Sequence, residues 1–271
     1  MKKSLLVLTA TLLAGTAASA ADIYNPFYLP QKGGFLSDTN AIYQNIENGD
    51  VENMVLSEGI AYGVTNKLAI TGTVADAWYL DNSEIDGRRV TGHNRYDNPA
   101  WDVGVKYNLI DCPKSHVKVQ VGANYTQGAY TMIPVPVLND GLTFDHHAKT
   151  FSGFVKAGFE VTEGFLPYVT GTVIKPIGKY EEQPTYIGRV GIYKTLTANL
   201  AADVGVDYAW SSATDDDDEY KGHGKVFALD GALNYKLSEN TSVGLTGSYV
   251  LDVKPGDYDY YTVGLNFKWA F

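Results

Sequence analysis

The chain has 271 residues, of which 45% are hydrophobic and 19% are charged, a composition too apolar for a disordered protein. Its mean hydropathy of −0.16 and the lack, after residue 20, of an apolar run long enough to cross a bilayer exclude a bundle of membrane-spanning helices. The 21 basic and 31 acidic residues leave a net charge of −10, which argues against nucleic acid as a partner.

Residues 1–20 have the features of a secretory signal peptide. Lys2 and Lys3 precede an apolar run, and small residues ending at Ala20 form an A-x-A cleavage site. We expect this segment to be removed during export into the periplasm. Because Cys112 is the only cysteine, the fold cannot depend on an internal disulfide bond.

Residues 21–34 form an N-terminal segment without the pattern of a strand. Pro26 and Pro30 exclude it from the middle of a sheet, since proline cannot donate a hydrogen bond to the strand ladder. We interpret this segment as a lead-in on the periplasmic side of the domain that follows, because chain termini are usually exposed. The alternative is a plug that folds into the interior of that domain.

From residue 35 to the end, polar and apolar residues alternate with a period of two, in pieces separated by turn residues. The last piece is the clearest, because the odd positions from Tyr261 to Phe271 carry large apolar side chains and the even positions are polar or small. Strands with one apolar face are therefore predicted at 35–46, 51–64, 67–80, 99–110, 115–128, 149–161, 165–175, 185–195, 199–211, 224–236, 242–252 and 258–271.

The links between these strands differ in length in a regular way. Short links at 65–67, 110–115, 162–164, 195–199 and 237–241 alternate with longer ones at 80–98, 132–148, 175–185, 211–223 and 253–258. In an antiparallel sheet this order places the short turns at one end and the long loops at the other. Only the first link, 47–50, is short where a long one is expected. An even number of strands with both termini at the short-turn end is typical of bacterial membrane barrels.

The C-terminal strand ends in Phe271, with Trp269 and Phe267 at alternate preceding positions. With the signal peptide and the alternating strands, this ending resembles the outer-membrane β-barrel proteins of Gram-negative bacteria, in a porin-like form without a named subfamily. The resemblance implies an all-β fold, a single transmembrane antiparallel up-and-down β-barrel of about twelve strands over residues 35–271. It also implies that Phe271, Trp269 and Phe267 form a membrane-insertion signal, which the barrel-insertion machinery reads.

Aromatic residues lie near the ends of the apolar faces, as Trp101 and Trp210 do, which suggests aromatic girdles at two membrane interfaces. A soluble sandwich of two sheets is the structural alternative. Such a sandwich would bury the aromatic faces between its sheets, and it gives no reason for the terminal Phe271.

Three predicted strands fit the barrel pattern poorly, and the weakest is the strand at 35–46, which shows little alternation. On the strand at 51–64, Glu58 falls on the apolar face, where a carboxylate in the middle of a bilayer costs about 2 kcal/mol or more. We therefore predict a β-bulge near Gly59 that turns Glu58 inward. The seventh strand is ambiguous, because Leu166 and Val169 select opposite faces as the apolar one.

The faces opposite the apolar ones predict the side chains that line the lumen. The charged residues at these positions are Asp102, Lys106, Lys118, Lys156, Glu160, Arg189, Asp203, Asp207, Asp230, Lys236 and Lys268. Six positive and five negative charges indicate no strong ion selectivity. Asp102 and Asp207 lie toward the long loops and most of the lysines toward the short turns, so the predicted pore is acidic at its mouth and basic at its base.

The number of strands and the small inward residues bear on the width of the lumen. Barrels of eight strands are filled by side chains and those of sixteen or more are wide channels, so about twelve strands predict a narrow lumen. Gly122, Gly158 and Gly205 are assigned inward, and we expect them to leave room inside the barrel. These features favour a passive channel for small hydrophilic solutes. The alternative is that the lumen charges pair and close the barrel, which would make it a structural or recognition barrel.

The expected partners follow from the location in the outer membrane. They are membrane lipid, the barrel-insertion machinery, the transported solutes, and lipopolysaccharide, whose phosphates Arg88, Arg89 and Arg95 could contact. Solvent contact is the simpler explanation of these three arginines.

A hydrolase remains a further alternative. Four histidines, His93, His146, His147 and His223, fall in the long loops, with Asp145 beside His146 and an acidic run at 215–219. An Asp–His pair could activate water, and an acidic run could hold a divalent cation. The spacing matches no metalloprotease or serine-hydrolase motif, so we expect no enzyme activity, catalytic residue, cofactor or metal site.

Overall fold

The computed structural model of the protein describes residues 23–46, 51–79, 84–85, 88–89, 99–112, 116–128, 149–177, 184–212, 223–254 and 260–271. Twelve strands form a closed barrel in which neighbouring strands are antiparallel. They are β1 (Phe35–Ile46), β2 (Val51–Gly63), β3 (Leu68–Tyr79), β6 (Ala100–Cys112), β7 (Val117–Gln127), β8 (Lys149–Phe159), β9 (Phe165–Pro176), β10 (Thr185–Thr197), β11 (Leu200–Ser212), β12 (His223–Lys236), β13 (Thr241–Lys254) and β14 (Tyr260–Ala270). This confirms the predicted all-β, up-and-down barrel.

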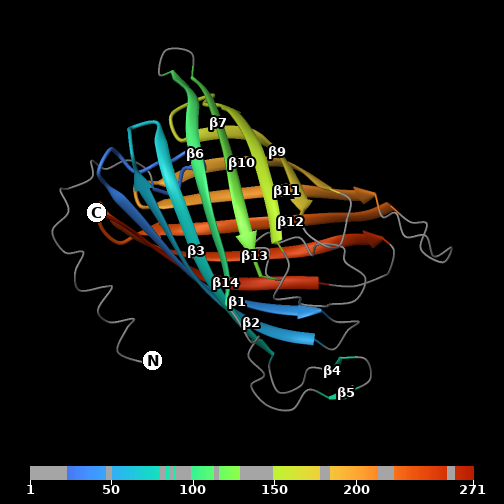
Figure 1. Ribbon diagram of the computed structural model, residues 1–271. Helices are drawn as coiled ribbons and strands as arrows, with labels where there is room; N and C mark the ends of the chain where they lie inside the picture. Colours follow the sequence, from blue (N-terminus) through green and yellow to red (C-terminus); the bar gives the residue numbers. More distant parts are fainter. Residues whose placement is uncertain are drawn as a thin grey trace.

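The strands follow one another around the wall in chain order, and β1 pairs with β14 to close it. Their ends differ from the predicted ends by at most two residues. Figure 1 shows the arrowheads of β1, β11 and β13 at one end of the barrel and the C-terminus at the other. Within the predicted loop 80–98, β4 (Glu84–Ile85) and β5 (Arg88–Arg89) form a small separate sheet, which the alternation pattern did not predict. The described residues include no helix long and apolar enough to cross a membrane.

The apolar side chains of the wall lie on its outer face. Val190 and Leu265, with exposed fractions of 63% and 65%, are examples of large apolar residues that face outward. The inner face is polar, with Asn234, Thr262 and Asn266 buried inside the barrel. This arrangement is the reverse of a soluble sandwich, and the closed ladder pairs the backbone groups of the wall. The predicted assignment of faces is confirmed for these strands.

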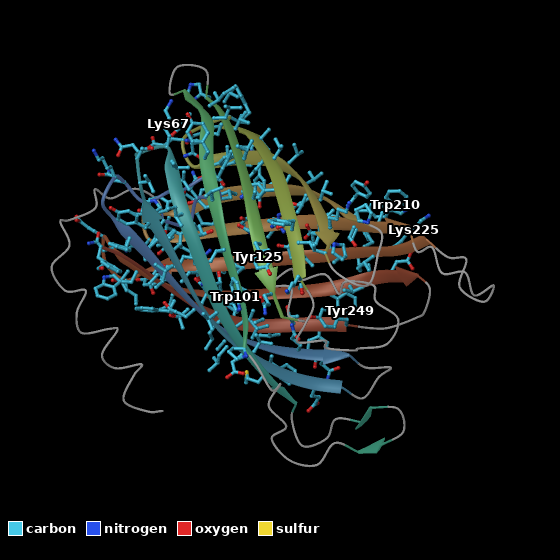
Figure 2. All side chains as sticks on the ribbon, viewed as in Figure 1. Lys67, Trp101, Tyr125, Trp210, Lys225 and Tyr249 are labelled. Atoms are coloured by element: carbon cyan, nitrogen blue, oxygen red, sulfur yellow. The ribbon has the colours of Figure 1, made fainter. Side chains whose placement is uncertain are left out.

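Aromatic rings gather at both ends of the outer face. Rings of Trp101 and Tyr125 lie 5.5 Å apart near the long loops, and Figure 2 shows both, with Trp210, at that end and Lys67 at the other. At the short-turn end, the ring of Phe271 lies 5.4 Å from that of Phe35. These two sets agree with the aromatic girdles predicted at the two interfaces of a bilayer.

Glu58 does not turn inward, so the prediction of a bulge near Gly59 is wrong. The β1–β2 and β2–β3 registers run through both residues without a shift. Glu58 stays on the outer face, where its Oε1 accepts a hydrogen bond from Ser37 Oγ at 2.7 Å and its Oε2 one from Thr39 Oγ1 at 2.5 Å. Two hydroxyl groups of β1 satisfy the carboxylate in place, and no backbone distortion is needed.

We expect Glu58→Gln to raise the free energy of unfolding of the barrel in lipid vesicles by about 1 kcal/mol, because the amide keeps a hydrogen-bonding group beside Ser37 without a charge facing lipid. Urea titration followed by tryptophan fluorescence measures the change. Glu52→Gln is the control: Glu52 lies nearer the end of β2 and accepts a hydrogen bond from Tyr43. A loss of stability in the Glu58 variant would contradict the prediction.

Candidate functional site: the barrel lumen

The N-terminal segment, described from residue 23, enters the barrel at its short-turn end, where residues 23–30 lie inside and residues 31–33 are exposed at the rim. Ile23, Tyr24 and Phe27 are buried in one cluster with inward side chains of β9, β10, β11 and β14, namely Leu166, Tyr168, Tyr193, Ala201 and Ala270. The interpretation as a lead-in outside the barrel is therefore wrong. The apolar side chains of the segment are covered only when it folds into the lumen, and this gain outweighs the usual exposure of a terminus.

Polar side chains of the wall hold the main chain of the segment. The carbonyl oxygen of Phe27 accepts hydrogen bonds from Asn108 Nδ2 at 3.3 Å and Gln120 Nε2 at 3.2 Å. Lys156 Nζ donates to the carbonyl oxygen of Pro26 at 2.9 Å. These three donors belong to β6, β7 and β8, so three neighbouring strands hold one turn of the segment.

The segment crosses the lumen from one wall to another. On one side, the ring of Phe27 packs edge-on against Tyr168, with ring centroids 6.2 Å apart. On the other, Gly33 N donates to the carbonyl oxygen of Gly63, at the end of β2, at 2.7 Å. The segment therefore narrows the lumen at the short-turn end.

The N-terminal segment explains why the sequence of β9 has apolar residues on both faces. Leu166 and Tyr168 are buried and face inward, whereas Val169 and Val173 face outward with exposed fractions of 52% and 43%. The two inward residues are large and apolar because they pack against the N-terminal segment. Apolar residues on both faces therefore mark a strand that contacts lipid on one side and the segment on the other.

Four of the predicted lumen residues meet in one cluster, which we call the Arg189 cluster. Arg189 of β10 forms ion pairs with Asp207 (Nη1–Oδ2, 3.1 Å), with Asp203 (Nη2–Oδ1, 3.5 Å) and with Asp230. Tyr168 OH accepts from Arg189 Nε at 2.9 Å and donates to Asp203 Oδ1 at 2.8 Å. One guanidinium among three carboxylates leaves this wall negative, and the pairing runs along β10, β11 and β12 rather than across the lumen.

Two lysines lie on other strands of the inner wall, Lys268 on β14 and Lys106 on β6. Lys268 Nζ lies 3.7 Å from Asp38 Oδ2, and Asp38 also accepts hydrogen bonds from Asn40 and Asn266. Lys106 lies on β6, four residues after Asp102, which accepts a hydrogen bond from Thr73.

Sequence reasoning missed Asp38 because β1 alternates weakly. Its position opposite Lys268 in the β1–β14 register is the signal that could have found it.

Lys118, Glu160 and Lys236 lie at the short-turn rim. Lys118 Nζ pairs with Asp111 Oδ1 at 3.1 Å, and Glu160 Oε1 accepts a hydrogen bond from the backbone of Gly164 at 3.3 Å. These three predicted residues line a cavity of about 600 Å³. They therefore border an entrance rather than the middle of the lumen.

The prediction that inward glycines leave open space in the lumen is wrong. A Cβ atom on Gly158 would lie 2.9 Å from the ring of Phe27, and one on Gly205 would lie 2.7 Å from the guanidinium carbon of Arg189. The ring of Phe154 occupies the corresponding space at Gly122. Small residues in this wall make room for a neighbouring side chain instead of for solute.

The terminal residue takes part in closing the barrel. Phe35 N donates to the carbonyl oxygen of Phe271 at 2.7 Å, and Phe271 N donates to that of Phe35 at 3.0 Å. The ring of Trp269 lies 4.8 Å from that of Phe271, and Phe267 is exposed on the outer face. The recognition of these residues by insertion machinery stays a prediction.

The residues considered for hydrolysis, metal binding or lipopolysaccharide contact fall mostly outside the described part. This applies to His93, Arg95, Asp145, His146, His147 and the run 215–219. Arg88 and Arg89 form β5, and His223 begins β12, but their side chains are outside the described part.

No protein-family model and no curated protein sequence matches the chain. Among solved structures, an outer membrane channel from Pseudomonas putida F1 matches with a TM-score of 0.66 and 12% identity, covering 91% of this chain and 98% of that one. The NanC porin matches with a TM-score of 0.54 and 10% identity, covering 85% and 98%. The chain shares the closed β-barrel fold of these two proteins.

Proposed function

We propose that this barrel is a narrow passive channel for small hydrophilic solutes in the bacterial outer membrane. The observation that carries the proposal is the inverted wall, apolar outside and lined inside by charged, amide and hydroxyl groups such as Lys106, Asn266 and Thr262. A polar lumen inside a lipid-compatible wall lowers the cost of moving a hydrated solute through the bilayer. The N-terminal segment and the inward side chains beside the glycines make this passage narrow.

Recording in planar lipid bilayers tests the channel. The full mature protein is expected to give stable ohmic steps of small conductance, because the N-terminal segment restricts the lumen. Heat-modifiable migration on gels establishes that the inserted protein is folded. Silence of a folded, inserted barrel would overturn the proposal in favour of a structural or recognition barrel.

The lumen carboxylates are expected to set ion preference. Replacing Asp102 and Asp207 together by asparagine removes two negative charges from the lumen, one of them in the Arg189 cluster, and should shift the reversal potential in a salt gradient toward anions. Glu52→Gln with Glu58→Gln removes the same charge from the outer face of β2 and should change the reversal potential much less. If the lumen variant has an unchanged reversal potential, Asp102 and Asp207 lie outside the conduction path.

We also propose that the barrel contacts membrane lipid, the barrel-insertion machinery and lipopolysaccharide. Membrane lipid contacts the apolar outer face, and the insertion machinery would read the aromatic C-terminal strand that ends in Phe271. Arg88, Arg89 and Arg95 would meet lipopolysaccharide phosphates if the loop 80–98 faces the outer leaflet. The enzyme alternative depends on loop residues outside the described part, whereas the polar lumen of the described residues favours a channel.

A further inference from the structure

Three lysines from separate strands lie beside the N-terminal segment on its long-loop side. Lys106 of β6 is one inward position nearer the long loops than Asn108, which holds the segment. Lys156 of β8 binds a main-chain carbonyl of the segment directly. Lys268 of β14 is one inward position nearer the long loops than Ala270, which packs on the segment. Three ammonium groups therefore lie above the N-terminal segment, which forms the floor of the lumen at its short-turn end.

The three ammonium groups lie at one level of the lumen, next to the N-terminal segment, where their positive charges act on one another. Lys268 disfavours the positive charge of Lys106, and both of these lysines disfavour that of Lys156. The carboxylates that face Lys106 are Asp38 and Asp102, and Asp38 also lies 3.7 Å from Lys268. Lys106 and Lys268 therefore share Asp38 as a counter-ion.

The remaining partners give neither Lys106 nor Lys156 a counter-ion of its own. Lys156 donates to the neutral carbonyl oxygen of Pro26, and the charged groups that it also faces are Asp203 and Arg189, which form an ion pair with each other. Among the described residues, no hydrogen bond or ion pair holds the ammonium group of Lys106. An ammonium group without such a partner in a confined site favours the binding of an anion.

We propose that Lys106, Lys156 and Lys268 form a binding subsite for the anionic group of a solute, a carboxylate or a phosphate, at the floor of the lumen. A lysine ammonium is a compact charge with three rotatable donors on a flexible stem, so three of them fit either anion without a fixed fork. The Arg189 cluster of β10, β11 and β12 is negative and repels the same anion, which favours binding near Lys106, away from Asp203. The subsite rests on the proposed channel only in that the solute reaches it from the long-loop end.

Calorimetric titration of the full mature protein in detergent with inorganic phosphate, with acetate and with glucose tests the subsite. Phosphate, acetate or both should bind the wild-type barrel, and glucose should not bind this subsite. Lys106→Gln should weaken the binding about tenfold, the loss expected from one charge-assisted hydrogen bond. Lys106→Arg keeps the charge and should retain most of the affinity. Lys194→Gln is the control, because Lys194 Nζ lies 5.3 Å from the ring of Phe165, away from the lumen.

The variants are compared only after heat-modifiable migration shows that each is folded. Equal anion binding by wild type and Lys106→Gln, or no binding of either anion to the wild type, would overturn the subsite. Planar-bilayer recording separates this result from the proposed function. Anion binding by a silent barrel would keep the subsite and remove the channel, while ohmic steps without anion binding would do the reverse.

Discussion

Deletion of residues 23–30 is expected to raise the single-channel conductance of the barrel several-fold. The deletion removes Phe27 and the two carbonyl groups that Asn108, Gln120 and Lys156 hold, so the short-turn end of the lumen opens to the width of a barrel of twelve strands. It keeps Gly33, which pairs with Gly63, and the predicted cleavage site after Ala20. Planar-bilayer recording of the deletion variant beside the wild type measures the change.

A milder variant separates loosening of the N-terminal segment from its removal. Asn108→Ala with Gln120→Ala removes both side-chain donors to the carbonyl of Phe27, and should give a noisier current with a conductance between wild type and deletion. Lys67→Ala, in an exposed turn at the same end, should behave as wild type. If the folded deletion variant conducts no better than wild type, the segment does not restrict the pore.

Replacement of Arg189 is expected to have the largest effect on stability. Arg189→Met leaves Asp203, Asp207 and Asp230 together without their counter-ion, and should lower the free energy of unfolding by about 3 kcal/mol. The side chain of Asp207 is only 8% exposed, so water screens this repulsion weakly. Urea unfolding in vesicles, followed by tryptophan fluorescence, measures the loss.

Two further variants identify the cause of that loss. Arg189→Met combined with Asp207→Asn and Asp230→Asn removes most of the repulsion, and should recover much of the lost stability. Lys194→Met removes a cation outside the lumen and should change the free energy of unfolding by less than about 1 kcal/mol. Wild-type stability of Arg189→Met would show that the cluster does not stabilise the barrel.

Tyr168 connects the Arg189 cluster to the N-terminal segment. Its hydroxyl group bonds both Arg189 and Asp203, while its ring packs against Phe27. The electrostatics of β10, β11 and β12 and the position of the segment therefore depend on one side chain. A loss of Arg189 should loosen the segment as well as the wall, and the current of that variant should be noisier than that of the wild type.

The sequence predicted the wall of the barrel well because alternation is a local property. In β14, Leu265 faces outward and Asn266 inward, as their positions require in any strand exposed to lipid on one side and a polar lumen on the other. The lengths of the links likewise predicted which strand ends lie together, since consecutive antiparallel strands return to the same edge. Neither inference needs knowledge of distant contacts.

The predictions that failed concern residues whose environment comes from another part of the chain. Glu58 stays on the outer face because Ser37 and Thr39, about twenty residues earlier, satisfy its carboxylate. Gly158 leaves no room because Phe27, from the N-terminal segment, fills the space beside it. A period of two cannot show which side chain will fill the space next to a small residue.

By itself, the sequence determined the class of the fold, the approximate bounds of the strands and the face of most wall residues, because these follow from the two-residue repeat of a strand and the closure of its backbone hydrogen bonds. Only the tertiary structure decided how the lumen is used. It joined Arg189 to carboxylates on neighbouring strands, folded residues 23–30 into the lumen beside the lysines, and placed Phe271 against Phe35. These contacts depend on the curvature and register of the closed wall, which bring together residues far apart in the chain.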